Sequence, residues 1–140
     1  MNKLYTDAAT KGNVGLGGIG ILIIAEGQQD QTHLPLPQTT NHEAEFQAAI
    51  AGFKRLLALG LTGPVSFYSD SKLVIEALDK NYAKHYADYV TELAALVSQF
   101  PLVLWQWLPD HQNRGAHMLA QQGLRAAEAQ EKRASARFRE

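Results

Sequence analysis

Three acidic residues of this chain lie in segments that could bring their carboxylates together. They are Asp7 in LYTDAAT, Glu45 in TTNHEAEF and Asp70 in VSFYSDS. Convergent carboxylates supply the oxygen ligands that hard divalent cations prefer. Two such ions, about 3.5 to 4 Å apart, can activate a water molecule and stabilise the leaving oxygen of a phosphodiester. The three acids therefore predict a divalent-metal site that cuts phosphodiester bonds.

Each acid also has an ordinary structural explanation. An aspartate at the end of a strand is commonly a turn former, which would account for Asp7 or Asp70 taken alone. A glutamate in the first turns of a helix, such as Glu45, is favoured by the helix dipole. Glu43 is assigned this ordinary role, because it completes a capping box with Thr40. Only the combination of the three remaining acids points to a site.

The apolar pattern predicts the elements that must position these acids. Strands are expected at residues 3–6, 17–24, 28–36, 65–69 and 102–108. Helices are expected from Thr40 to about Gly60, at residues 71–78 and 82–100, and from Asn113 onward, with a loop at 109–112.

The short links between the first three strands suggest an antiparallel meander. Pro35 and Pro37 place the third strand at a sheet edge. The order βββαβααβα predicts an α/β fold, with a mixed sheet and helices packed on it. Asp7 and Asp70 are each expected to end a strand and Glu45 to begin a helix, which is how α/β folds assemble their sites.

Length and composition indicate one globular domain. Of the 140 residues, 1–128 are expected to form the domain, and 129–140 a charged helical extension or frayed tail. The absence of cysteine excludes disulfides, thiolate zinc sites and cysteine nucleophiles, which suits a reducing cytoplasm. The longest apolar run, residues 19–25, is too short to cross a bilayer. We therefore expect a cytoplasmic protein without membrane partners.

The net charge of −1 provides no global basic field. A polyanionic substrate would have to be held by local contacts and by bound metal.

Three blocks of the sequence, taken in order, resemble type 1 ribonuclease H over about residues 3–125. They are YTDAA with the glycine-rich strand after it, TTN-x-EAEF-x-A, and YSDS-K-x-V, and N-x-x-A-x-x-LA in the last helix adds to them. The resemblance implies a ribonuclease H-like fold, whose five-stranded mixed sheet has the order 3-2-1-4-5 and helices on both faces. It also implies endonucleolytic cleavage of the RNA strand of an RNA/DNA hybrid, which leaves 5′-phosphate and 3′-hydroxyl ends. A divalent cofactor, usually Mg²⁺, is implied as well, with Asp7, Glu45 and Asp70 as three of its four carboxylate ligands.

The chain departs from the family pattern at several points. The fourth acid of the family, in N-x-x-A-D-x-L-A, is His117 here, and the second of two asparagines is His42 beside Asn41. Residues 71–100 contain no basic helix-loop, so the chain is expected to be a compact variant without a separate hybrid-binding domain.

An imidazole in place of a carboxylate removes one negative charge, and it suits Mn²⁺ better than Mg²⁺. We therefore predict that His117 is a catalytic metal ligand, that the second, more weakly held ion is affected most, and that Mn²⁺ is preferred. Alternatively, His117 shuttles protons near the leaving group, because an unperturbed imidazole has a pKa of about 6.5. Both roles predict that function falls below roughly pH 6. The remaining alternative is a surface histidine without a role in the site.

Recognition of RNA requires contacts to the 2′-hydroxyl and to the phosphates. The resemblance makes the backbone of residues 8–10 and the amide of Asn41 candidates for the first task, and His111 a candidate for contacting substrate or moving a proton. Lys72 is a candidate for phosphate contact. The predicted substrate-binding residues are thus Ala8, Ala9, Thr10, Asn41, Lys72 and His111.

Two other functions stay open at this point. One is a catalytically weak nucleic-acid-binding module with the same fold, and the other is a related nuclease, such as a 3′–5′ exonuclease or a resolvase. The expected partner in the leading interpretation is an RNA/DNA hybrid, bound by a monomer.

Overall fold

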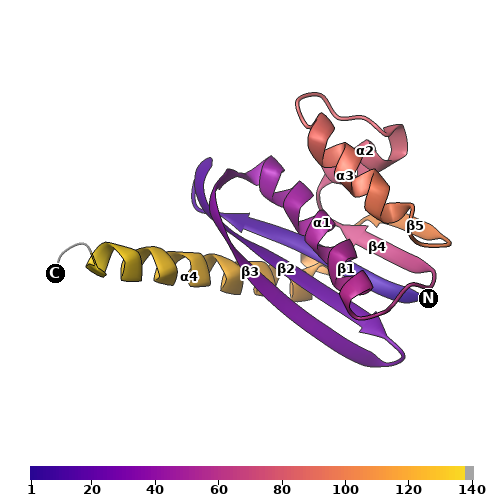
Figure 1. Cartoon of the computed structure of the whole chain (residues 1–140), viewed down its shortest axis with the longest axis horizontal. Coiled ribbons are helices and arrows are strands. Elements are labelled where there is room, and N and C mark those ends of the chain that lie inside the picture. Colours follow the sequence, from indigo (N-terminus) through magenta and orange to yellow (C-terminus); the bar gives the residue numbers. More distant parts are fainter. Residues whose placement is uncertain (138–140) are drawn as a thin grey trace.

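Residues 1–137, the part of the chain that this computed structural model describes, form a five-stranded mixed sheet with helices on both faces (Figure 1). The strands are β1 (Asn2–Thr10), β2 (Val14–Ala25), β3 (Gln28–Thr40), β4 (Val65–Ser69) and β5 (Val103–Trp107). The helices are α1 (Asn41–Ala58), α2 (Lys72–Lys80), α3 (Ala87–Val97) and α4 (Arg114–Arg137), and a short 3-10 helix, η1 (Asp110–Gln112), precedes α4. The strand order β3-β2-β1-β4-β5 confirms the predicted order.

The sheet combines an antiparallel half with a parallel half. Strands β1, β2 and β3 form the predicted antiparallel meander, and β3 lies at the edge with its prolines, as expected. Strand β4 runs parallel to both β1 and β5. Because parallel strands end at the same edge of a sheet, the loops that follow β4 and β5 emerge on the same side of the molecule.

The predicted end of the first strand was wrong. Strand β1 continues past Asp7 to Thr10, because the longer β2 keeps pairing with it, and Asp7 lies opposite Gly20 in that ladder. What stops near Asp7 is the pairing with β4, whose last partners are Thr6 and Ser69. Asp7 is therefore an interior strand residue at the point where one of its two neighbouring strands ends.

Several other element boundaries differ from the prediction, and the two largest differences lie at the end of β3 and the start of α3. Strand β3 extends to Thr40 instead of Leu36, directly up to the start of α1. Helix α3 begins at Ala87, so residues 82–86 are not helical. Asn81 ends α2 in a left-handed conformation with φ 52°, and His85 has φ 70°. These two turns separate α2 from α3 where the apolar pattern alone predicted a longer helix.

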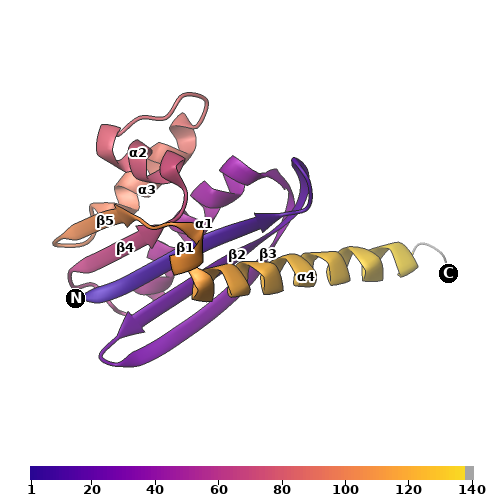
Figure 2. The same ribbon diagram turned by 180° about the vertical axis from the view of Figure 1, so that it is seen from behind.

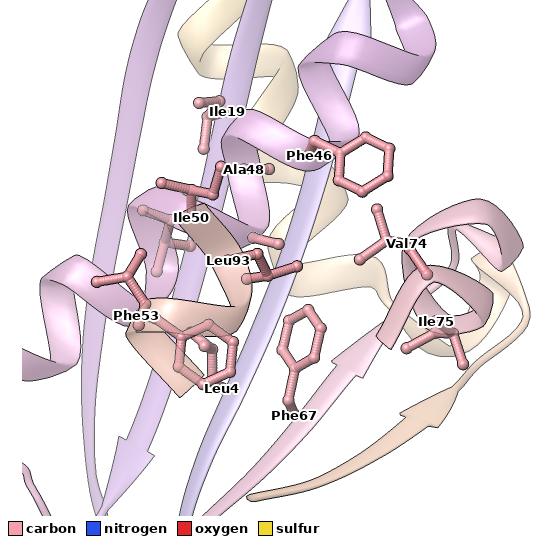
Figure 3. Close-up of a cluster of buried hydrophobic side chains, with 14 of the residues drawn as sticks. Leu4, Ile19, Phe46, Ala48, Ile50, Phe53, Phe67, Val74, Ile75 and Leu93 are labelled. Carbon is pink, nitrogen blue, oxygen red and sulfur yellow. The ribbon is translucent and has the colours of Figure 1, made fainter. Parts of the chain in front are cut away.

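Helices α1, α2 and α3 cover one face of the sheet, and α4 covers the other (Figures 1 and 2). The main core lies on the face of the three helices, where Leu4 and Phe67 of the sheet meet Phe53 of α1 and Leu93 of α3 (Figure 3). These side chains are no more than 1% exposed, and their burial helps to hold α1 on the sheet.

Helix α4 lies unusually close to β2, because glycines face it. A Cβ atom at Gly20 would collide with the backbone carbonyl of Ala116, and one at Gly18 would collide with the backbone of Leu124. The absence of side chains at these two positions lets the first turns of α4 approach the sheet beside Asp7, the residue paired with Gly20.

Helix α4 continues without a break to Arg137, beyond the edge of the sheet (Figure 2). The predicted division between residues 1–128 and 129–140 stays a prediction, and residues 138–140 lie outside the described part of the chain. Among the residues described, none of the helices combines the length and the apolar character needed to cross a membrane.

Candidate active site

Three elements bring Asp7, Glu45 and Asp70 together. Asp7 lies on β1, Asp70 directly follows β4, and Glu45 lies in the second turn of α1. Since β1 and β4 are parallel neighbours whose pairing ends at Thr6 and Ser69, the two aspartates come at the same level of the sheet. One carboxylate oxygen from each of the three acids lies within 4.8 Å of the others.

The cap of α1 decides which glutamate enters the site. The backbone N–H of Glu43 donates to the Thr40 hydroxyl at 3.2 Å, and the backbone N–H of Thr40 donates to the Glu43 carboxylate at 3.0 Å. This confirms the predicted capping box. The carboxylate of Glu43 is thereby turned back toward the helix start, while Glu45 points into the buried interior with 7% of its surface exposed.

The three carboxylates repel one another in a buried environment. Burial, together with the charges of Asp7 and Asp70, raises the pKa of Glu45 to about 10. Burial and then the charge of Asp7 raise the pKa of Asp70 to about 8. Burial also raises the pKa of Asp7 itself, against the opposing effect of its hydrogen bond with His117. Positive charge is what this cluster lacks.

The residues present fit a divalent cation. Glu45 Oε2 is buried and has no hydrogen-bond partner among residues 1–137. An unpaired buried oxygen is costly, so a site that leaves one normally has a ligand for it. An oxygen-only set from Asp7, Glu45 and Asp70 is what Mg²⁺ or Mn²⁺ accepts.

The structure brings His117 to the same site. Its Nδ1 lies 3.0 Å from Oδ2 of Asp7, and 43% of its side chain is exposed. Asn113, just before α4, is 1% exposed and donates through Nδ2 to the Thr6 carbonyl at 2.9 Å. This bond fixes the start of α4 to β1 one residue before Asp7, so His117 is held at the site and is not a detached surface residue.

One acid that the sequence reasoning missed also lies here. Oδ1 of Asp110, in η1, is 3.9 Å from Nδ1 of His117, and Asp7, Asp110 and His117 each offer a ligand atom within 4.8 Å of the others. A signal was available, because the loop after β5 must open at the same sheet edge as the loop that carries Asp70.

An open pocket of about 440 Å³ surrounds these groups. Besides the four acids and His117, its lining includes Ala8, Asn41, His42, Ser71, Lys72 and Leu73. Of the predicted substrate-binding residues, Ala8, Asn41 and Lys72 therefore line the pocket, whereas Ala9, Thr10 and His111 are not part of the lining. Nζ of Lys72 lies 5.0 Å from the ring centroid of Trp107, whose indole N–H donates to the Asp70 carbonyl at 3.0 Å.

Comparison with known sequences also relates this chain to ribonuclease H. Residues 5–123 match the reverse transcriptase-like family model. EbsB of Enterococcus faecalis, whose name places it among hydrolases, is 44% identical over 127 residues, which are 89% of this chain and 94% of EbsB. A ribonuclease H of Pseudomonas putida is 32% identical over 140 residues, covering 87% of this chain and 92% of the enzyme.

Solved structures share the fold. The N-terminal ribonuclease H domain of Rv2228c from Mycobacterium tuberculosis superposes with a TM-score of 0.85 at 27% identity, over 93% of this chain and 97% of that one. The ribonuclease H1 called LC11, solved in complex with an RNA/DNA hybrid, gives a TM-score of 0.82 at 24% identity, over 91% and 99% of the two chains. At that identity the second likeness shows the fold alone.

Proposed function

Since this chain belongs to the reverse transcriptase-like family, with type 1 ribonuclease H domains as its relatives, we propose that it is an endoribonuclease that cleaves the RNA strand of RNA/DNA hybrids. One observation carries the proposal. Asp7, Glu45 and Asp70 converge within 4.8 Å in an open pocket, and Glu45 contributes a buried oxygen without a partner in residues 1–137.

The proposed cofactor is Mg²⁺ or Mn²⁺. Asp7, Glu45 and Asp70 would hold one ion, and Asp7 with His117 would contribute to a second. Bound in this way, divalent ions would supply Lewis-acid activation of water and charge stabilisation at the leaving oxygen, and the products would carry 5′-phosphate and 3′-hydroxyl ends.

The surrounding residues of the chain would position the substrate. Lys72 places a positive charge at the pocket wall, where it suits a phosphate of the RNA strand. Ala8 and Asn41 line the pocket and offer a backbone group and an amide for the 2′-hydroxyl, the group by which RNA differs from DNA. His117, held by Asp7, can accept or donate a proton at the rim. A monomeric state and a cytoplasmic location stay predictions from the sequence.

A cleavage assay tests the proposal. The RNA strand is labelled at one end, annealed to DNA or to RNA, and incubated with the protein in Mg²⁺ or in Mn²⁺. We expect internal cuts in the RNA of the hybrid only, and Asp70→Asn should lower the rate at least about a hundredfold while keeping the fold. Shortening from one end only would indicate an exonuclease instead.

His117 favours one second candidate, a hybrid-binding module with little catalysis, because an imidazole brings no negative charge to a site for two dications. The wild type could bind hybrid and yet, in both metals, cut it no faster than Asp70→Asn does. That result would establish the binding module and exclude the enzyme.

A further inference from the structure

We propose that Asp110 is a metal-binding residue of this site, and that it supplies from the turn before α4 the carboxylate that His117 lacks. The inference rests on the proposed function, and it concerns a residue outside the three acids that carry that function.

The position of Asp110 suits this role. Its Oδ1 lies 3.9 Å from His117 Nδ1, and both residues offer a ligand atom within 4.8 Å of one from Asp7. Asp110 lines the same pocket as Asp70 and Glu45. Asp7 is thus shared by two groups, one with Glu45 and Asp70 and the other with Asp110 and His117.

The turn that carries Asp110 is fixed to the strands that carry the other acids. The N–H of Leu108 donates to the Ser69 carbonyl at 2.9 Å, directly before Asp70. Asn113, at the other end of the turn, donates to the Thr6 carbonyl at 2.9 Å, directly before Asp7. A carboxylate on so short a turn, bonded to the strands at both ends, is held near the pocket by the backbone.

The ordinary role of an aspartate at a turn does not account for this residue. Such an aspartate commonly accepts a bond from a backbone N–H two or three positions later. Here the N–H of Gln112 donates to the Pro109 carbonyl and the N–H of Asn113 to the Asp110 carbonyl, both at 2.9 Å. The backbone satisfies the turn by itself, and the side chain of Asp110 stays 75% exposed, on the pocket side.

A separate observation points to a ligand in the pocket. Glu45 is 7% exposed, one of its carboxylate oxygens lies within 4.8 Å of ligand atoms of Asp7 and Asp70, and its Oε2 has no hydrogen-bond partner in the described residues. A cation at Asp7 and Glu45 leaves one face of Asp7 toward His117. A second cation there would meet one neutral imidazole and one shared carboxylate, and Asp110 adds the further negative charge and oxygen that hard cations require.

Titration calorimetry with Mn²⁺ alone tests the assignment on the full chain. The wild type should bind two ions, one more weakly than the other. Asp110→Asn should weaken the weaker binding at least about tenfold and leave the stronger one unchanged. Asp88→Asn, the same substitution at an exposed position in the first turn of α3, should behave as the wild type. Wild-type binding by Asp110→Asn, or a single ion in the wild type, would overturn the proposal.

A rescue variant separates loss of the carboxylate from local damage. Placing His117→Asp in the Asp110→Asn background returns a carboxylate to the helix, so the weaker ion should be regained. Absence of recovery in a variant with the wild-type circular dichroism spectrum and Tm would contradict the proposal that Asp110 supplies the carboxylate that His117 lacks.

Hybrid cleavage, measured in parallel, distinguishes this proposal from the previous one. If the wild type cuts hybrid and Asp110→Asn binds Mn²⁺ normally, only the assignment of Asp110 fails. If Asp110→Asn loses the weaker ion but the wild type does not cut hybrid, the assignment stands and the ribonuclease function fails.

Discussion

At the scale of single residues, Asp7 connects the parts of the site. Asp7 is 3% exposed, and one of its carboxylate oxygens lies within 4.8 Å of carboxylate oxygens of Glu45 and Asp70. Its Oδ2 lies 3.0 Å from Nδ1 of His117. Without a cation, burial first and then the charges of Asp7 and Asp70 raise the pKa of Glu45, so this acid holds a proton. Cation binding and proton binding therefore compete for the same oxygens.

This competition predicts how the stability of the metal-free protein depends on pH. Glu45 has an ordinary pKa of 4.5 when unfolded, and burial raises its pKa to about 10 in the folded state, so the folded protein binds the extra proton between these values. The free energy of unfolding should then fall as pH rises from about 5.5 to 8, by at most about 1.4 kcal/mol per pH unit for this group. Urea unfolding in EDTA measures the slope.

Glu45→Gln should make that slope shallower and raise stability at the alkaline end, while the raised pKa of Asp70 keeps part of the slope. Glu76→Gln, on the exposed face of α2, serves as the matched control and should keep the wild-type slope. A stability that rises with pH over this range in the wild type would contradict the assignment of a proton to the cluster.

The imidazole of His117 predicts a metal preference. Cleavage by the wild type should be faster in Mn²⁺ than in Mg²⁺ by about tenfold or more, because imidazole suits Mn²⁺ better than Mg²⁺. His117→Asp supplies oxygen in its place and should bring the ratio of the two rates close to one. Rates that are already equal in the wild type would count against His117 as a ligand.

At the scale of elements, the site depends on how closely α4 approaches β2. Gly20 is opposite Asp7 on β2 and lies under the first turns of α4, where no side chain fits. The same strand therefore pairs with the acid and admits the helix that carries His117.

Gly20→Ala tests this dependence. The added Cβ would meet backbone atoms of Ala116, which cannot swing away as a side chain could, so α4 must shift. We expect a loss of about 1 to 3 kcal/mol in the free energy of unfolding, together with weaker binding of the second Mn²⁺. Gly63→Ala, where a Cβ meets nothing within 4 Å, is the control. Equal stability of the two variants would show that α4 is not held by this close contact.

Much of the element order could be predicted, because the apolar residues that a helix or strand buries recur in the sequence with the spacing of that element. The capping box at Thr40 followed from a local pattern, and the strand order from the resemblance. The end of β1 did not follow, since the length of a strand depends on its neighbour and not on its own residues. Asp110 was missed because a single acid in a loop has no period, and only the parallel pairing of β4 with β5 brings its loop to the site. The convergence of Asp7, Glu45 and Asp70 is in the structure, while their roles stay proposals.

At the scale of the whole molecule, the proposed function requires binding of a polyanion without a basic field, since the net charge of the chain is −1. Attraction to a hybrid has to come from a few local cations and from metal in the pocket. Among the predicted binding residues, Lys72 is a cation that lines the pocket, where it lies beside Trp107.

Lys72→Ala should therefore weaken hybrid binding and reduce the slope of log affinity against log salt by about one. Affinity is measured by fluorescence anisotropy with Asp70→Asn as background, so that the hybrid stays intact. Lys3→Ala, at the amino end of β1 and away from the pocket, should leave the slope unchanged. The same slope change in both variants would mean that Lys72 acts only through overall charge.

The most direct test of the metal centre is anomalous diffraction from crystals soaked in Mn²⁺. We expect two anomalous peaks in the pocket, one bound by Asp7, Glu45 and Asp70, and one within bonding distance of Asp7, His117 and Asp110. A single peak at the three acids, with His117 Nδ1 still hydrogen-bonded to Asp7, would contradict the proposed role of His117 at the second ion. No peak in the pocket at all would contradict the metal-dependent nuclease itself.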